Sequence, residues 1–123
     1  MSPSRTAATT AGDLQVFKAA FFKALAHPVR IRILEVLVRG EKSVQELQER
    51  LVLGQPVVSQ QLAVLRANRI VVGRKQGVRV RYAVRDPLVA NLLATARQIF
   101  NNQLIGTQDL LRQLREERGR QPA

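Results

Sequence analysis

The stretch from Gly54 to Arg85 constrains the fold of this chain more than any other, because a helical pattern gives way there to an alternating one. Gly54 suits the N-cap of a helix, and Pro56 suits its first turn, where a missing N–H costs nothing. Apolar residues then recur at helical spacing, at Val58, Leu62 and Leu65. We therefore predict a helix with one buried stripe and an opposite face open to a partner, ending near Asn68 in a left-handed turn.

The second half of this stretch alternates with a period of two. Apolar residues at Val78, Val80, Tyr82 and Val84 alternate with a mainly basic set, Arg79, Arg81, Ala83 and Arg85. Such alternation is typical of a strand with one buried and one basic face. With a preceding strand over residues 70–72 and a turn at Gln76-Gly77, it predicts a basic two-stranded hairpin. A helix followed by such a hairpin is the second half of a winged helix-turn-helix.

Charge separates this region from the rest of the chain. Every charged residue from Arg50 to Arg85 is basic, whereas the whole chain has 20 Lys or Arg, 9 Asp or Glu and a net charge of +11. A polyanion on this surface would meet no like charge and would release its counterions, which favours nucleic acid as the partner. The alternative is a basic sheet face that is only solvated.

Several classes of protein and site are disfavoured by composition. The chain has 123 residues, which suits one domain, and no cysteine, which excludes disulfides and thiolate metal sites. It has no run of eighteen apolar residues and no signal-peptide pattern, and its basic residues fall on a hairpin rather than along an amphipathic helix. We expect no membrane partner and a cytoplasmic bacterial protein, associated with the nucleoid when bound to DNA.

Start and stop signals divide the remainder. Residues 1–12 are predicted to be a disordered arm, 13–117 the DNA-binding and dimerisation domain, and 118–123 a frayed tail. Helices are predicted to begin at Asp13 as N-cap, at His27-Pro28, and at a capping box formed by Ser43 and Glu46. The last of these, a short helix, precedes Gly54 closely and completes the helix-turn-helix.

A further helix is predicted after the hairpin, from Asp86-Pro87 to about Leu104. Gly106-Thr107 either kinks it or separates a last helix over 108–117. The first helix and this one both carry more apolar surface than a small domain can cover, so we predict that they form a dimer interface, although a core face remains an alternative for the first. The interface residues are Leu14, Phe17, Phe21, Leu88, Leu92, Ile99 and Phe100.

Nothing in the sequence points to catalysis. His27, the single histidine, stands beside a proline at a helix junction, and the chain lacks a cysteine nucleophile, a phosphate-binding glycine loop and a metal cluster. We expect a protein that is not an enzyme and has no cofactor. The competing hypothesis to a sequence-specific regulator is an architectural protein that coats DNA through charge alone.

The chain resembles the ArsR/SmtB family of bacterial winged-helix repressors. Three segments carry the resemblance, which spans roughly Asp13 to Phe100: Phe22 to Leu34, Gln55 to Arg66, and Gly73 to Tyr82. The resemblance implies a mainly α fold with a small β-hairpin wing, with the helices before and after the wing forming the interface of a homodimer. It also implies two recognition helices in successive major grooves of a palindromic operator.

Site residues follow from the same resemblance. The recognition helix would contact DNA through Gln55, Pro56, Val57, Ser59, Gln60 and Gln61, and the wing and its flank through Arg66, Arg74, Lys75, Gln76, Arg79 and Arg81. An amide on Gln60 or Gln61 would recognise adenine bidentately. Pro56 stands where a small hydroxyl residue is common and Gln60 where a basic residue or histidine is common, which suggests a different operator.

Many members of that family sense metals, with thiolates near the helix over 44–51 or with His and carboxylates after the wing. Here the first region has Gln45, Glu46 and Gln48, and the second has no histidine, leaving Asp86 and Asp109. Two carboxylates without nitrogen or sulfur partners make a poor transition-metal site. The chain is thus similar to the family's non-metal-sensing members, and no particular small-molecule inducer is indicated.

Overall fold

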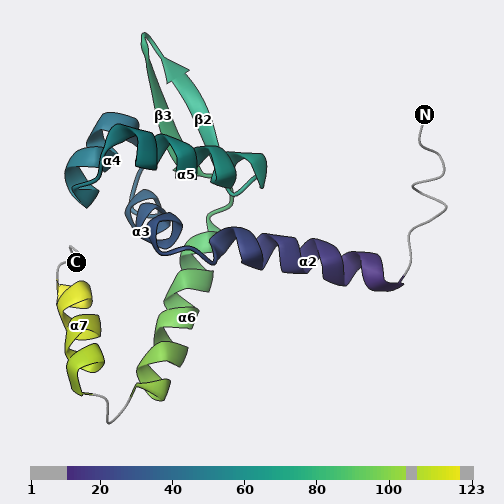
Figure 1. The fold of residues 1–123 in the computed structure, drawn as a ribbon, viewed down its shortest axis with the longest axis vertical. Helices are drawn as coiled ribbons and strands as arrows, with labels where there is room; N and C mark the ends of the chain where they lie inside the picture. Colours follow the sequence, from purple (N-terminus) through teal and green to yellow (C-terminus); the bar gives the residue numbers. More distant parts are fainter. Residues whose placement is uncertain (1–10, 105–107, 120–123) are drawn as a thin grey trace. The chain divides into compact units, whose positions relative to one another are not determined.

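The computed structural model describes residues 11–104 and 108–119 and divides the chain into two compact units, residues 1–86 and 87–123. In the first unit, helices α2 to α5 and a small sheet follow one another; the second holds two helices (Figure 1). The elements are α2 (Ala11–Leu25), α3 (Pro28–Leu37), β1 (Lys42–Ser43), α4 (Val44–Leu51), α5 (Gln55–Ala67), β2 (Val71–Gln76), β3 (Arg79–Val84), α6 (Leu88–Gln103) and α7 (Gln108–Gly119). The predicted mainly α fold with a β wing is confirmed.

The core of the first unit lies where α3, α4 and α5 pack against one another and against the sheet. Its buried apolar residues are Ala24, Ile33, Leu34, Leu37, Leu47, Leu51, Val58, Leu62, Leu65, Ile70 and Val71. The predicted stripe of α5 is buried as expected, since Val58, Leu62 and Leu65 are each at most 2% exposed. Burying this stripe fixes which face of α5 turns outward.

Side chains cap the helices that frame this core. His27 is the N-cap of α3, where its Nδ1 accepts a hydrogen bond from the N–H of Val29 at 3.1 Å. At α4 the predicted capping box is complete: the Ser43 hydroxyl accepts from the N–H of Glu46, and the Glu46 carboxylate accepts from the N–H of Ser43. Each such cap satisfies donors that the first turn of a helix leaves open.

Two arginines of α3 donate hydrogen bonds to backbone carbonyls at the C-terminal ends of the neighbouring helices. Arg30 donates to the carbonyl of Ala24 near the end of α2 at 2.9 Å, and Arg32 donates to the carbonyl of Leu51 at the end of α4 at 2.8 Å. A cation at the C-terminus of a helix also interacts favourably with the helix dipole. These arginines therefore brace the fold.

The end of α5 differs from the prediction by one residue. Asn68 keeps φ −95° and ψ 11°, and its side-chain amide donates to the carbonyl of Val64, while Arg69 takes the left-handed conformation with φ 60°. The N–H of Ile70 then donates to the carbonyl of Leu65, and that of Arg69 to the carbonyl of Arg66. This is a Schellman motif, which points the chain from α5 into the sheet.

The sheet has three strands rather than the predicted two, in the order β1-β3-β2, and all pairs are antiparallel. The segment Lys42–Ser43 adds the third strand, pairing with Tyr82 and Arg81. Two residues are too few for an alternating pattern to reveal a strand, which is why sequence reasoning missed it. β3 is therefore the central strand.

The hairpin turn is also displaced from the predicted Gln76-Gly77. Gln76 pairs with Arg79, so Gly77 and Val78 form the turn, and Gly77 has φ 65°. Glycine in the first of two turn positions matches a type II′ turn, which suits the twist of paired strands. Val78 is consequently fully exposed at the tip, and the prediction that it belongs to a buried strand face was wrong.

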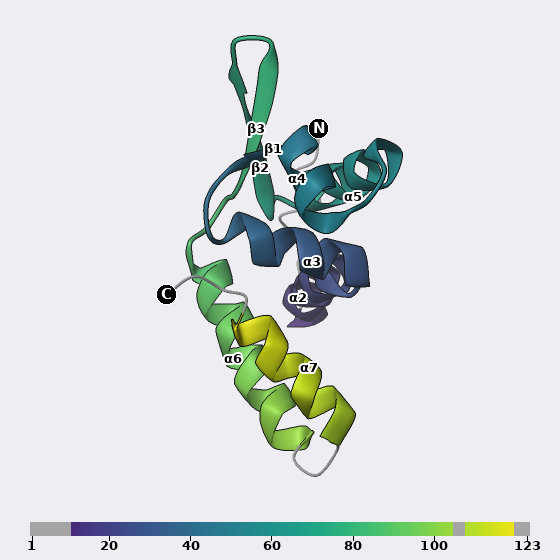
Figure 2. The same ribbon diagram turned by 90° about the vertical axis from the view of Figure 1, so that its left-hand side faces the viewer.

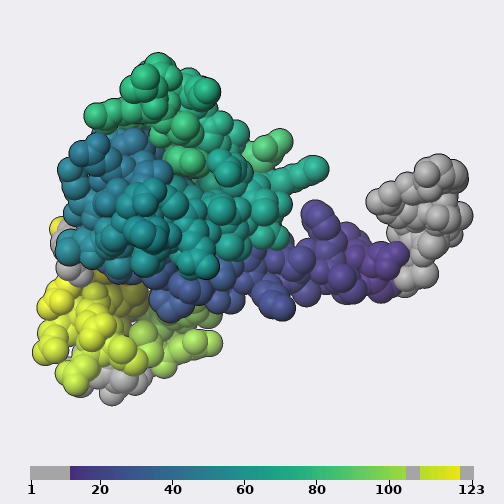
Figure 3. Space-filling model, turned by 45° about the horizontal axis from the view of Figure 1, so that its top comes forward, coloured from purple at the N-terminus to yellow at the C-terminus, as the bar shows by residue number. Residues whose placement is uncertain are grey.

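α2 stands out from the body formed by α3 to α5 (Figure 3). It already includes Ala11 and Gly12, so Asp13 lies within its first turn instead of capping it; the rest of the predicted arm lies outside the described residues. Leu14 and Phe17 are exposed and Phe21 is half-buried, with its ring edge-on to that of Phe22 at 5.4 Å. Most of this apolar face is left uncovered within the first unit.

The second unit is a pair of antiparallel helices, in which α7 lies alongside α6 (Figure 2). Arg97 of α6 and Glu117 of α7 form an ion pair at 3.0 Å. α6 begins at Leu88, one residue later than predicted, and α7 ends at Gly119, two residues later. Residues 105–107, including the predicted break at Gly106-Thr107, lie outside the described residues, but the two helices on either side are distinct.

Within residues 11–104 and 108–119, no helix is long and apolar enough to cross a lipid bilayer.

Candidate nucleic-acid interface

The outward face of α5 carries no charged side chain over its first three turns. Pro56, Gln60 and Ala63 are exposed, and so is Val57 on the flank. Gln55 and Ser59 are one turn apart, and the Gln55 amide donates to the Ser59 hydroxyl at 3.0 Å. Arg66 is exposed in the last turn. Small side chains and amides on one face of a helix permit close approach to the edges of bases.

Gln60 and Gln61, both predicted to contact bases, have different surroundings. Gln60 is exposed, but Gln61 is half-buried, and its Oε1 is shielded from solvent without a hydrogen-bond partner. Bidentate recognition of adenine needs both the oxygen and the nitrogen of the amide. The placement of Gln61 therefore argues against the predicted role, and Gln60 is the amide of the pair that can face a base.

The wing formed by β2 and β3 carries its charges in two places. At the tip, Lys75, Gln76 and Arg79 are exposed, and neither Lys75 nor Arg79 has an acidic partner in the part of the chain that the structure describes. The pair formed by Arg74 and Arg81 across the strands, which lies below the tip and is termed the base of the wing, is different. There both guanidinium groups contact acidic side chains.

Glu41, in the segment before β1, binds both arginines at the base. Its carboxylate accepts from Nη2 of Arg74 at 2.6 and 2.7 Å and from Nε of Arg81 at 3.0 Å. Arg81 also contacts the Glu46 carboxylate of α4 at 3.3 Å. The expectation of a surface free of acids is corrected here, because acids from outside residues 50–85 fold onto it.

Arg81 is less exposed than predicted for a residue on the free, basic face of a strand. Its side chain is 23% exposed, because β1 and the start of α4 flank β3. The apolar residues on the other side of β3, Val80, Tyr82 and Val84, are only half-buried. The predicted division into a buried and a basic face is therefore blurred along the central strand.

The electrostatics of Glu46 reflect this network. The N–H of Ser43, which donates to its carboxylate, and the neighbouring positive charge of Arg81 hold the pKa of Glu46 below its ordinary value of 4.5, against an opposing desolvation. Glu46 thereby links the first turn of α4 to the central strand of the sheet.

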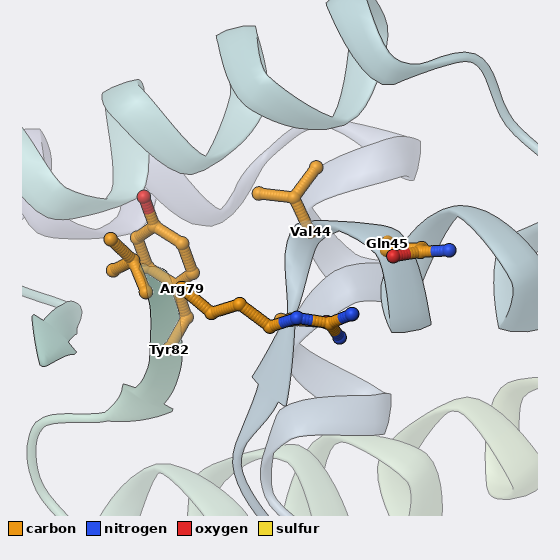
Figure 4. Close-up of a pocket in the computed structure, with 6 residues that line it drawn as sticks. Val44, Gln45, Arg79 and Tyr82 are labelled. Carbon is orange, nitrogen blue, oxygen red and sulfur yellow. The ribbon is translucent and has the colours of Figure 1, made fainter. Parts of the chain in front are cut away.

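A shallow cavity of about 260 Å³ opens between the wing and the start of α4. Ser43, Val44, Gln45, Arg79, Val80 and Tyr82 line it. Figure 4 shows the Arg79 side chain extending from β3 toward the start of α4, with the Tyr82 ring beside it. Gly73 pairs with Tyr82, and a Cβ at Gly73 would come within 3.1 Å of that ring, so a larger residue would require the ring to shift.

The predicted interface residues are distributed over both units. On α2, Leu14 and Phe17 are exposed, and on α6 Leu88, Ile99 and Phe100 are about half to two thirds exposed. Phe21 and Leu92 are half-buried. Among the described residues, no group of three or more His, Cys, Asp or Glu side chains is arranged to hold a metal ion.

Comparison with known proteins gives consistent results. The family model described as "Bacterial regulatory protein, arsR family" matches residues 27–72. An uncharacterized HTH-type transcriptional regulator of Mycobacterium tuberculosis, Rv0081, is 45% identical over 103 residues, which is 83% of this chain and 90% of that protein. The biofilm growth-associated repressor of Xylella fastidiosa is 40% identical over 85 residues, covering 69% and 75%.

Solved structures agree with these sequence matches. The crystal structure of Rv0081 superposes with a TM-score of 0.71 and 44% identity, covering 77% of this chain and 96% of that one. A solution structure from Mycobacterium bovis, described as a homodimeric winged helix-turn-helix DNA-binding domain, gives a TM-score of 0.70 and 27% identity, covering 80% and 93%.

Proposed function

Because the chain belongs to the ArsR family of bacterial regulatory proteins, a family of winged helix-turn-helix transcriptional regulators, we propose that it represses transcription as a homodimer bound to a palindromic operator. The observation that carries the proposal is an uncharged, exposed face on α5 together with cations at the tip of the wing that have no acidic partner among the described residues. A relative named as a repressor supports the direction of regulation.

We assign recognition of the base sequence to α5. Gln60 is exposed in the middle of its outward face, and an amide can donate to and accept from the N7 and N6 edge of adenine. Gln55, Pro56, Val57 and Ser59 lie at the N-terminal end of the helix, the end that helix-turn-helix proteins place against bases. Contact through this face would supply specificity.

We assign affinity for the DNA backbone to the wing tip and to Arg66. Lys75 and Arg79 have no acidic partner among the described residues, so their charges are available to phosphates. Each phosphate neutralised releases counterions, which strengthens binding to any sequence. These contacts position α5 but do not themselves select a site.

The homodimer is supported by apolar surface that each unit leaves open. Leu14 and Phe17 on α2 are more than half exposed, as is Leu88 on α6, and exposed aromatics of this size are typical of subunit interfaces. The related M. bovis domain is described as homodimeric. Two copies related by a two-fold axis would set α5 helices into half-sites about one helical turn apart.

This function requires binding and no catalysis, and we propose that the protein is not an enzyme. We further propose that no transition metal is its signal, because the chain has no cysteine and a single histidine to serve as ligands.

Sequencing the fragments that the purified protein retains from its host genome, followed by footprinting, tests the proposal. We expect a protected palindrome bound roughly a thousandfold or more tightly than random duplex of equal length. Retention of all fragments alike, with no protected palindrome, would instead identify an architectural protein that binds by charge.

A further inference from the structure

Glu41 shares one carboxylate between two arginines that face each other across the base of the wing. Arg74 and Arg81 are direct partners in the pairing of β2 with β3, so their side chains leave the same face of the sheet. Two like charges so placed repel each other, and the carboxylate between them offsets that repulsion. This attraction to both arginines stabilises the observed position of the Glu41 side chain.

The two arginines are held in different ways. Arg81 is 23% exposed and has further acceptors: the Glu41 carbonyl at 3.1 Å and the Glu46 carboxylate at 3.3 Å. Arg74 is 68% exposed, and the contacts that the structure gives its guanidinium are the two to the Glu41 carboxylate. Loss of that carboxylate would free Arg74 while leaving Arg81 anchored.

We propose that Glu41 withholds Arg74 from DNA, so that the wing binds phosphates through Lys75 and Arg79 alone. The inference rests on the proposed function. A carboxylate and a phosphate compete for the same guanidinium, and both oxygens of the Glu41 carboxylate already accept from Nη2 of Arg74. A phosphate that approached Arg74 would also be repelled by the charge of Glu41.

The consequence is that Glu41 limits affinity for DNA of any sequence. Every duplex presents phosphates, so an additional backbone contact would tighten binding to random DNA as well as to an operator. By neutralising one wing arginine, Glu41 would keep more of the total binding energy in the contacts that distinguish sequences.

The test is the salt dependence of binding to a random duplex, measured by fluorescence anisotropy. Glu41→Gln removes the charge and retains an acceptor of the same shape. We expect the slope of log affinity against log salt to become steeper by about 0.9 per wing, and binding near 0.1 M salt to tighten roughly eightfold per wing. An unchanged slope, or weaker binding, would overturn the inference.

Two variants separate release of Arg74 from a simple change in net charge. In Glu41→Gln/Arg74→Gln the released arginine is absent, so the slope should return to the wild-type value. Glu49→Gln removes the same charge from an exposed site on α4 and should leave the slope unchanged. A slope that stays steep in the double variant, or steepens equally in Glu49→Gln, would contradict the proposed role.

A third variant does not depend on the stability of Glu41→Gln. Arg74→Gln alters an exposed side chain and, since Arg74 is already withheld, should leave the slope within experimental error of wild type. A slope that is shallower by about 0.9 would show that Arg74 contacts phosphate in the native protein and would overturn the inference. Wild-type protein that binds no duplex at all would refute the proposed function itself, an outcome distinct from each of these.

Discussion

The base and the tip of the wing carry the same residue types and differ in what surrounds them. At the base, Arg74 and Arg81 contact Glu41, and Arg81 also contacts Glu46. At the tip, Arg79 stands opposite Gln76 and has no acidic partner among the described residues. One pair of strands thus holds cations that form ion pairs within the protein and cations that remain available to a ligand.

The difference shows that net charge overstates the capacity of this surface for phosphates. The Arg81 side chain connects β3 to Glu41, just before β1, and to Glu46 of α4, as Arg30 and Arg32 connect α3 to the ends of its neighbours. An arginine with several protein acceptors contributes to folding stability, whereas a solvated one contributes mainly to association. Substitutions at the base and at the tip should therefore have separable effects.

Arg81→Ala should give the largest loss of stability. It removes two hydrogen bonds to Glu41 and an ion pair with Glu46, and it leaves both carboxylates without the guanidinium between them. We expect the free energy of unfolding in urea to fall by about 2 kcal/mol at fixed protein concentration. Arg81→Lys should recover less than half, because an ammonium cannot make the same divergent contacts. Full stability in Arg81→Ala would remove the distinction between base and tip.

Arg79→Ala should leave the free energy of unfolding within about 0.5 kcal/mol of wild type, because the side chain is exposed. Its effect should appear in DNA binding. There the negative slope of log affinity against log salt should become shallower by about 0.9 for each wing, on every sequence tested. Anisotropy titrations between 50 and 200 mM salt, roughly the range in which such slopes are measured, give this value. An unaltered slope would exclude the wing tip as a phosphate contact.

Glu46 should give the smallest effect, visible as a dependence on pH. Its pKa is lowered in the folded protein, so its carboxylate stabilises the fold above the unfolded value near 4.5, and that contribution is lost as pH falls through the lower, folded pKa. Glu46→Gln should be less stable than wild type at neutral pH, and the difference should shrink on acidification below 4.5. A difference that grew on acidification would contradict the assigned cause.

Local signals in the sequence predicted much of this fold. The capping box from Ser43 to Glu46 is a four-residue pattern with its own hydrogen bonds, and the stripe of α5 follows from helical spacing. Such features are decided by neighbours in the chain, so a single sequence contains them. The exposed amide at Gln60 was predictable for the same reason, since it lies opposite that stripe.

The network at the wing base was not predictable in this way. Glu41 meets Arg74 and Arg81, which lie 33 and 40 residues further along the chain, so only the tertiary fold brings them together. β1 is too short to show alternation, yet it makes β3 central and partly covers Arg81. The shielding of Gln61 likewise depends on packing around α5, which helical periodicity does not specify.

The ratio of affinities for the operator and for a random duplex tests the division between α5 and the wing most directly. Once the operator is identified by genomic fragments, the ratio is measured for wild type, Gln60→Ala and Arg79→Ala at one salt concentration. We expect Gln60→Ala to lower the ratio by about 2 kcal/mol per half-site, roughly thirtyfold, and Arg79→Ala to weaken both duplexes alike and preserve it. A preserved ratio in Gln60→Ala together with a reduced one in Arg79→Ala would contradict the account.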